Sequence, residues 1–244
     1  MHANSATPTI EQVRAFWDRH PLFTGEARHP TGSRGWFLEH EQVYINDCFA
    51  GRPPDPIFTR GLDSGCRLLD VGCGPGFWVR YFLRQGFRHV SACDLAPRSV
   101  ELTCRSLELF GLDADVHVGN AEELPYAAGQ FDHINCQGVL HHTPCPRRAL
   151  EEFHRVLRPN GTLCFSVYHT NFLLRRPWLL KCFSRICAPF IKLKGRGREK
   201  LLASGRADEI VRMYDGRDNP LGRSYTLAEL RQLVEGLFQI EEVG

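Results

Sequence analysis

The stretch "LLDVGCGPGFW", residues 68–78, decides how the rest of the chain is interpreted. An apolar run that contains Asp70 leads into three glycines on alternate positions, Gly72, Gly74 and Gly76. This pattern is typical of a buried strand that turns into a helix, because glycine adopts positive φ angles and lets another group approach the backbone closely. The stretch therefore predicts a ligand lying against this turn, with a carboxylate beside it.

Composition limits the class of protein. The chain has 244 residues, of which 43% are hydrophobic, so it can form one large domain with a sizeable core. A net charge of +2 gives no reason to expect a nucleic acid or an acidic partner. Several of the ten cysteines fall inside apolar runs, which indicates reduced thiols. No leader or uncharged apolar segment long enough to span a membrane is present, so we expect a cytoplasmic protein.

Apolar runs alternate with helical patterns through the middle of the chain. Strands are expected at residues 67–72, 89–95, 115–120, 131–138 and 162–168, and the amphipathic patterns between them are closed by Gly86, Gly111 and Gly161. This order predicts an α/β fold with a doubly wound, Rossmann-like, mostly parallel sheet and helices on both faces.

Four parts are expected along the chain. Residues 1–60 predict a short helix, a loop and a linker, and residues 61–169 form the core. An insertion occupies residues 170–225, and residues 226–244 resume the alternation with a helix and a strand at "FQIEEVG". Because that strand would not complete the sheet, either the sequence is truncated there, which we expect, or the last strand is supplied otherwise.

The turn after the first strand argues against a dinucleotide. A dinucleotide site is typically formed by the pattern G-x-G-x-x-G, which would place its third glycine at position 77. Here position 77 is Phe, and the third glycine comes one residue early. The Asp70 carboxylate would also repel a pyrophosphate, so a cationic group such as an amino group suits it better. Asp94, at the end of the second strand, is placed to accept both hydroxyls of a ribose.

Five ordered blocks carry a resemblance to a known family. They are "LLDVGCGPG", "CDLAP", "GNAEELP", "FDHINCQGVLHHTP" and "ALEEFHRVLRPNGTL", and they cover residues 65–168 densely. Together they resemble the class I S-adenosylmethionine-dependent methyltransferases, above all the quinone-biosynthesis-type small-molecule enzymes. The resemblance implies S-adenosylmethionine as cofactor and a small, apolar or aromatic methyl acceptor.

The resemblance also implies roles for individual residues. Asp70 would face the amino group of the methionine portion, Asp94 would bind the ribose, and Gln137 would lie near the methionine end. Asn120 stands where an Asp is usual in the family, but an amide can serve both sides of the adenine edge. The full set of expected cofactor residues is Asp70, Gly72, Cys73, Gly74, Gly76, Asp94, Leu95, Asn120, Ala121 and Gln137, with Phe16 and Trp17 as a cover. Phe16 and Trp17 can equally be packing aromatics.

A general base is needed only if the accepting atom carries a proton. The candidates are His141 and His142 on the loop after the fourth strand, and His20, which the family's N-terminal cover would bring near the cofactor. The double histidine recurs in the family whatever the chemistry, so a structural role is the alternative. With Cys145 these histidines could hold a metal, but no distant ligand accompanies them, so we expect no metal.

The insertion is rich in basic residues. Residues 171–200 contain nine Lys or Arg and one acid, and an amphipathic helix is expected after Pro177 and before Pro189. Its apolar face would be Leu179, Phe183, Ile186 and Phe190. Such a helix can contact an anionic membrane surface through residues 171–194, or act as a lid whose apolar face packs on the core.

The sequence thus predicts methyl transfer to a small acceptor whose accepting atom, oxygen, carbon or nitrogen, is not indicated. Two alternatives remain: a catalytically silent module that binds the cofactor, and an RNA methyltransferase that uses the basic insertion. Nucleic acid is disfavoured, because the motif that amine-methylating enzymes carry after the fourth strand is replaced here by "NCQGVLHH". Nothing in the sequence indicates an oligomeric state.

Overall fold

The structure is a computed structural model that describes residues 7–23, 25–172, 174–187, 190 and 207–243. Its centre is a sheet of five strands in the order β3-β2-β1-β4-β5, with every neighbouring pair parallel. The strands are β1 (Arg67–Val71), β2 (His89–Asp94), β3 (Asp115–Val118), β4 (Phe131–Gln137) and β5 (Leu157–Ser166). The order reverses between β1 and β4, which opens a crevice at their carboxyl ends.

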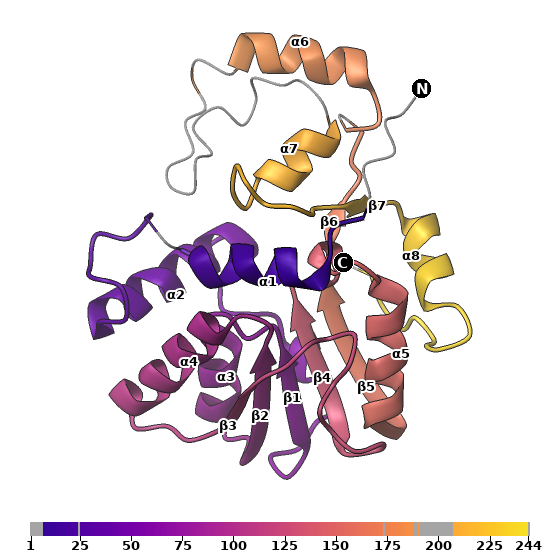
Figure 1. Cartoon of the computed structure of the whole chain (residues 1–244). Helices are drawn as coiled ribbons and strands as arrows, with labels where there is room; N and C mark the ends of the chain where they lie inside the picture. The colour runs from indigo at the N-terminus through magenta and orange to yellow at the C-terminus, as the bar shows by residue number, and fades with distance from the viewer. Residues whose placement is uncertain (1–6, 24, 173, 188–189, 191–206, 244) are drawn as a thin grey trace.

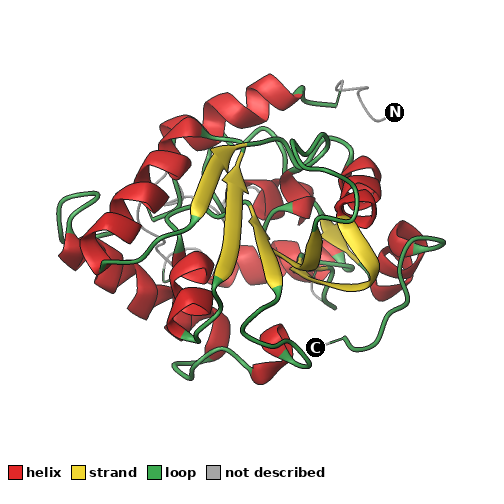
Figure 2. Ribbon diagram, turned by 90° about the horizontal axis from the view of Figure 1, so that it is seen from below, coloured by secondary structure: helices red, strands yellow, loops and turns green. Residues whose placement is uncertain are grey.

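Helices cover both faces of this sheet (Figure 2). The crossover helices are α3 (Phe77–Arg84), α4 (Pro97–Phe110) and α5 (Pro146–Val156). Successive strand residues point to opposite faces, so Leu68 joins a core with α3 while Leu69 joins a second core with α5. The predicted doubly wound, Rossmann-like fold is confirmed.

One element boundary differs from the prediction. The helix expected to end at Gly161 ends at Val156, and β5 begins at once with Leu157. Phe131 pairs with Leu157 but His133 pairs with Thr162, so β5 contains extra residues opposite β4. Asn160 takes up this excess in a left-handed conformation at φ 64°.

The N-terminal region holds more helix than expected. The predicted short helix is α1 (Ile10–Arg19), which begins with a capping box between Thr9 and Gln12. The region expected to be loop and linker also contains α2 (Arg34–Phe49) and the short η1 (Pro56–Thr59). Apolar residues occur all around α2, so no amphipathic stripe marks it in the sequence.

The segment after β5 carries short elements near the carboxyl ends of the strands. They are β6 (Tyr168–His169), α6 (Pro177–Cys187), α7 (Ala207–Met213), β7 (Ser224–Tyr225) and α8 (Leu227–Val234). β6 pairs in parallel with β7, and Figure 1 shows α1, α7 and α6 stacked beyond the sheet. The strand expected at "FQIEEVG" is wrong, because residues 238–243 form none.

The helix predicted after Pro177 is confirmed as α6, but its predicted apolar face is turned outward. Ile186 is 69% exposed and Phe183 is 37% exposed, while Leu180 is buried. Pro189, expected to end or kink the helix, lies outside the described residues. No helix in the described ranges combines the length and the apolar character needed to cross a bilayer.

Candidate active site

A cavity of about 380 Å³ lies at the carboxyl ends of the strands. It extends from the glycine turn after β1 to η2 (Leu140–His142), the short helix after β4. Of the residues predicted from the sequence, those that line it are Trp17, Gly72, Gly74, Asp94, Leu95, Asn120, Ala121, Gln137, His141 and His142. Ten of the predicted cofactor and catalytic residues thus meet in one space.

Two positions of the turn are occupied by glycine for different physical reasons. Gly72 has φ +76°, and a Cβ there would collide with Cγ2 of Val139. Gly74 has φ +51°, and a Cβ there would meet no atom within 4 Å. Gly72 is therefore required by packing, whereas the open side of Gly74 leaves room for a ligand.

Asp70 is buried behind the cavity and does not line it. Its Oδ1 accepts a hydrogen bond from Asn135 Nδ2 at 2.7 Å, and its buried Oδ2 has no partner among the described residues. Burial raises the pKa of Asp70 to about 7, and repulsion from Asp94 adds to this. One carboxylate oxygen therefore lacks a donor.

Asp94 lies at the end of β2 and shapes the turn. Its Oδ2 accepts from the Gly74 amide at 2.9 Å, and its Oδ1 accepts from the Ala96 amide at 2.9 Å. Burial raises the pKa of Asp94 to about 6, although both amide hydrogen bonds oppose that shift. The Ser99 side chain also hydrogen-bonds to this carboxylate, which still leaves an acceptor position for a hydroxyl group.

A chain of side-chain amides connects the cavity to Asp70. Gln137 Nε2 donates to Asn135 Oδ1 at 2.8 Å, and Asn135 donates in turn to Asp70. Asn135 pairs with Asp70 across β4 and β1, so both side chains leave the sheet on the same side. Gln137, predicted near the methionine end, is therefore tied to the acid predicted there.

Some predicted residues do not reach the cavity. Phe16 is buried and its ring packs against Trp17 and His20, so only Trp17 faces the site. Cys73 is buried beside Thr103. The residues outside the lining are Asp70, Cys73, Gly76, Phe16 and His20. Asn120 lines the cavity, while its Oδ1 accepts from the Glu122 amide at 3.0 Å and holds the turn after β3.

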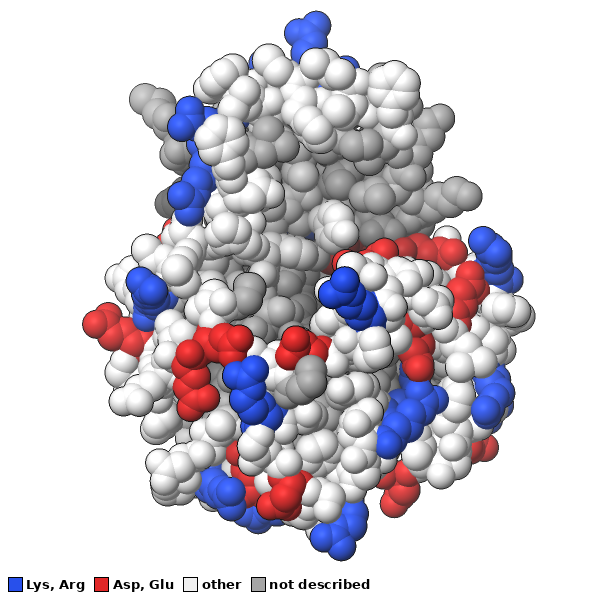
Figure 3. Space-filling model, turned by 180° about the vertical axis from the view of Figure 1, so that it is seen from behind, with Lys and Arg blue, Asp and Glu red and all other residues white. Residues whose placement is uncertain are grey.

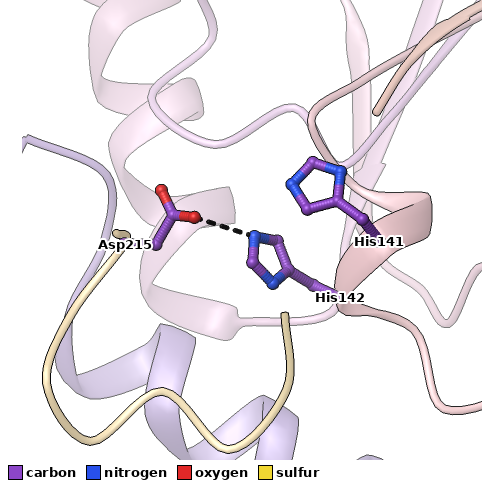
Figure 4. A group of neighbouring side chains, drawn as sticks. All are labelled: His141, His142 and Asp215. Carbon is purple, nitrogen blue, oxygen red and sulfur yellow. Dashed lines mark hydrogen bonds and ion pairs between the residues drawn. The ribbon is translucent and has the colours of Figure 1, made fainter. Parts of the chain in front are cut away.

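His142 is engaged at both ring nitrogens. Nδ1 lies 2.6 Å from the Leu221 carbonyl oxygen, and Nε2 lies 3.1 Å from Asp215 Oδ2 (Figure 4). Asn219 Nδ2 also lies 3.4 Å from Nδ1, but the shorter contact of each ring nitrogen is with an acceptor. This geometry is satisfied when the ring carries two protons and pairs as a cation with the carboxylate. In that state His142 has no lone pair with which to take a proton from a substrate.

His141 differs from its neighbour. Its ring is 2% exposed, and its Nδ1 has no hydrogen-bond partner among the described residues. Burial lowers the pKa of His141 well below its usual value, and His142 lowers it further. His141 is therefore a neutral imidazole at the wall of the cavity.

Asp215 is the site residue that sequence reasoning missed. It lies in "MYDGRDNPLG", residues 213–222, where nothing distinguishes it from an ordinary turn acid. It brings a distant carboxylate to the two histidines, and His141, His142 and Asp215 offer ligand atoms within 4.8 Å of one another. Cys145 is exposed and is not part of this group. The absence of a metal stays a prediction.

Comparisons with known proteins agree with this geometry. A family model described as a methyltransferase domain matches residues 69–165. A ubiquinone biosynthesis O-methyltransferase of Thiobacillus denitrificans is 30% identical over 183 residues, which cover 70% of this chain and 76% of that protein. One of Aromatoleum aromaticum is 28% identical over 171 residues, or 67% of this chain and 73% of that protein.

Among solved structures, a SAM-dependent methyltransferase from Aquifex aeolicus aligns with a TM-score of 0.55 and 19% identity. The alignment covers 81% of this chain and 84% of that one, and at this identity it shows a shared fold. Together with the relatives, the family model and the ordered glycine and acid positions, this places the protein. The chain belongs to the class I S-adenosylmethionine-dependent methyltransferases.

Proposed function

We propose that the protein transfers the methyl group of S-adenosylmethionine to a hydroxyl group of a small, apolar aromatic acceptor. The observation that carries this proposal is the single cavity that joins the glycine turn and Asp94 to His141, Tyr168 and Tyr214. The relatives are named as O-methyltransferases, which supports oxygen as the accepting atom.

The residues present fit this cofactor. Asp70 and Asp94 are two carboxyl groups whose mutual repulsion is relieved by a cation, and Oδ2 of Asp70 lacks a donor. We assign the amino group of the methionine portion to Asp70, directly or through water, and the ribose hydroxyls to Asp94. Leu95, Asn120 and Ala121 would surround the adenine. When bound, the cofactor supplies a methyl group already activated on a sulfonium.

The wall of the cavity disfavours an anionic acceptor, because the acids Glu26, Asp47 and Asp215 are part of it. Aromatic side chains of Trp17, Tyr168 and Tyr214 line it, and no Lys or Arg does so among the described residues. A nucleic acid would need cations to neutralise its phosphates. Figure 3 shows acidic and basic side chains interspersed on one face of the molecule, which gives RNA no continuous basic track there.

His141 is the base that we assign. Its neutral ring can take the proton of the acceptor hydroxyl as the oxygen attacks, because proton removal strengthens the nucleophile. Both ring nitrogens of His142 are already engaged, by the Leu221 carbonyl and by Asp215. His20 packs on Phe16 and does not line the cavity. The other two predicted bases are therefore given no proton-transfer role.

An apolar acceptor dissolves in membranes. The exposed surface of α6 suits contact with a membrane. Trp178 and Ile186 are 64% and 69% exposed, and residues 174–187 contain four Lys or Arg and no acid. We include contact of this surface with anionic lipid in the proposal, because apolar insertion and attraction of cations to lipid phosphates act together.

The test is transfer of labelled methyl from S-adenosylmethionine to a hexyl-substituted catechol. The matched control is the dimethyl ether of that catechol, which has the same apolar body and no hydroxyl. We expect labelled methyl ether from the catechol only, and a kcat about a hundredfold lower in His141→Ala. Binding of the cofactor without transfer to the catechol would contradict the proposed activity and favour a silent module.

A further inference from the structure

One oxygen of Asp215 contacts two side chains whose rings pack against His141. Oδ2 lies 3.1 Å from Nε2 of His142, and it accepts the hydroxyl of Tyr168 at 2.5 Å. The ring centroid of His141 lies 4.2 Å from that of His142 and 4.1 Å from that of Tyr168. A single carboxylate therefore fixes both walls against which the His141 ring rests.

The backbone around Asp215 is anchored to the same place. The Leu221 carbonyl lies 2.6 Å from Nδ1 of His142, and the Arg223 amide donates to the His141 carbonyl at 3.1 Å. The Arg223 guanidinium donates to the carbonyls of Thr143 and Pro144, both at 3.2 Å. Asp215, Leu221 and Arg223 thus clasp η2, and Asp215 is the acidic member of this clasp.

Burial makes this contact sensitive to loss of either partner. Asp215 is 6% exposed and His142 is 5% exposed, so the two groups interact where water screens little. Leaving one of them without its partner costs more than the pair contributes, because the remaining charge stays buried. The arrangement therefore holds as a unit or is lost as a unit.

We propose that Asp215 is a positioning residue for methyl transfer, which keeps the His141 ring oriented toward the acceptor through His142 and Tyr168. This role rests on the proposed function, in which His141 takes the acceptor proton. Proton transfer requires an atom placement accurate to a fraction of an ångström, so a base whose flanking rings are free to rotate loses much of its effect.

The same arrangement keeps His141 unprotonated. His142 as the cationic partner of Asp215 stands beside the His141 ring, and a positive neighbour disfavours a second positive charge. Burial is the largest cause of the lowered pKa of His141, His142 is the second, and Asp215 itself acts weakly in the opposite direction. His142 therefore both contacts the His141 ring and disfavours its protonation.

The test is a double-mutant cycle on kcat with the hexyl-substituted catechol. We expect Asp215→Asn to lower kcat about thirtyfold in the wild-type background and less than about twofold in His141→Ala, because the residue acts through a side chain already removed. Equal losses in both backgrounds would overturn the proposal, since a general effect on the fold is independent of His141. The Kd for S-adenosylhomocysteine should stay within about twofold throughout.

Two further variants keep the test decisive. Asp218→Asn changes an exposed acid three positions along and should leave kcat unchanged. Tyr168→Phe keeps the ring and removes one bond to Asp215, so it should lower kcat in the wild-type background only. It replaces Asp215→Asn if that variant does not fold, as judged by its thermal midpoint.

A readout without turnover separates this inference from the proposed function. In ¹⁵N-histidine-labelled protein without ligand, both ring nitrogens of His142 should give N–H signals at neutral pH, and Asp215→Asn should abolish one of them. A neutral His142 in the wild type would overturn the inference. If His141→Ala keeps full activity, the assigned base is wrong. If His141→Ala is impaired and Asp215→Asn is not, only the positioning role is wrong.

Treatment with a chelator tests the alternative that His141, His142 and Asp215 hold a metal ion. Dialysis against EDTA should leave kcat and the His142 signals unchanged, because a proton joins His142 to Asp215. Loss of activity that a divalent cation restores would overturn the proposal in favour of an ion held by His141, His142 and Asp215.

Discussion

Asn135 Nδ2 donates to Asp70 Oδ1 at 2.7 Å, across the two strands where the order of the sheet reverses. The bond satisfies one oxygen of a buried carboxylate and leaves the other without a donor. An ionised carboxylate in that position destabilises the fold unless a ligand supplies the missing partner. Asp70, which we assign to the cofactor, therefore destabilises the ligand-free protein when it is ionised.

The first prediction is that Asp70→Asn stabilises the ligand-free protein at pH 8. The pKa of Asp70 is raised from 3.8 to about 7, so between these values the folded state holds a proton that the unfolded state has lost. Unfolding stability therefore falls as pH rises through this window. The variant escapes that loss and should gain up to about 4 kcal/mol, since the pKa rises by about three units and each unit corresponds to about 1.4 kcal/mol.

Urea unfolding of both proteins at pH 4 and pH 8 measures this difference. It should be largest at pH 8 and shrink toward pH 4, where Asp70 is protonated in the folded state. Asp113→Asn, which changes an exposed acid, is the control. The variant should also bind S-adenosylhomocysteine more weakly, and a gain in stability with undiminished affinity would contradict the assignment of Asp70 to the cofactor.

The second prediction concerns the pH dependence of cofactor binding. In the proposed site the ribose hydroxyls donate to an ionised Asp94, whose pKa is raised to about 6. Affinity for S-adenosylhomocysteine should therefore fall below pH 6 by up to about tenfold per unit, in addition to the loss caused by protonation of Asp70 near pH 7. Asp94→Asn should bind about 1.5 to 3 kcal/mol more weakly at pH 8, because a charge-assisted hydrogen bond is lost.

Calorimetric titrations at several pH values check this prediction. The variant should lose the step that centres near pH 6, because an amide does not titrate. A step of the same size in Asp94→Asn would show that another group, such as Asp70, controls the pH dependence.

The sheet and the cofactor half of the site could be predicted from the sequence because local signals determine them. Period-two apolar runs mark buried strands, and the position of Gly74 requires a residue that tolerates positive φ. Asp94 follows directly from its place at the end of a strand. These signals involve residues close together in the chain.

The clasp could not be predicted, because its partners are far apart in sequence. His142 and Asp215 are 73 residues apart, and no spacing rule connects a loop histidine to a turn acid. Asn135 carried a weaker signal, since a polar residue inside an apolar strand needs a buried partner. α2 was missed because its apolar residues do not form one stripe, although its adjacent Trp36 and Phe37 are both buried.

The third prediction is that the protein binds anionic vesicles through α6. Trp178 and Ile186 should insert below the lipid phosphates while Arg175 and Lys181 attract them. Ile186→Ser should reduce cosedimentation with phosphatidylglycerol vesicles several-fold. Leu38→Ser is the matched control, because Leu38 is 47% exposed on α2, away from this helix.

Changes of ionic strength and of lipid composition test the predicted binding to anionic vesicles further. Binding should weaken at high ionic strength and be weak on uncharged phosphatidylcholine vesicles, since each cation near the surface contributes about 1 kcal/mol. Equal binding of Ile186→Ser and the wild type would show that α6 is not the contact. Its exposed side chains would then have another role.

The last prediction separates the two glycines of the turn. In Gly72→Ala the new Cβ collides with Val139 and the backbone is held at positive φ, so the fold should lose about 2 to 4 kcal/mol. In Gly74→Ala the Cβ meets no protein atom within 4 Å, so only the φ cost of about 1 kcal/mol applies. The space that this Cβ takes belongs to the cavity, and cofactor affinity should fall at least about tenfold.

Thermal unfolding with and without S-adenosylhomocysteine distinguishes the two effects. At about 100 times its Kd, the ligand should stabilise the wild type by about 2.7 kcal/mol. Gly74→Ala should unfold close to the wild type without ligand and gain much less from it, because its Cβ occupies the ligand's space. The opposite pattern, a stable Gly72→Ala and a Gly74→Ala that gains the full increment, would mean that the cofactor does not lie across this turn.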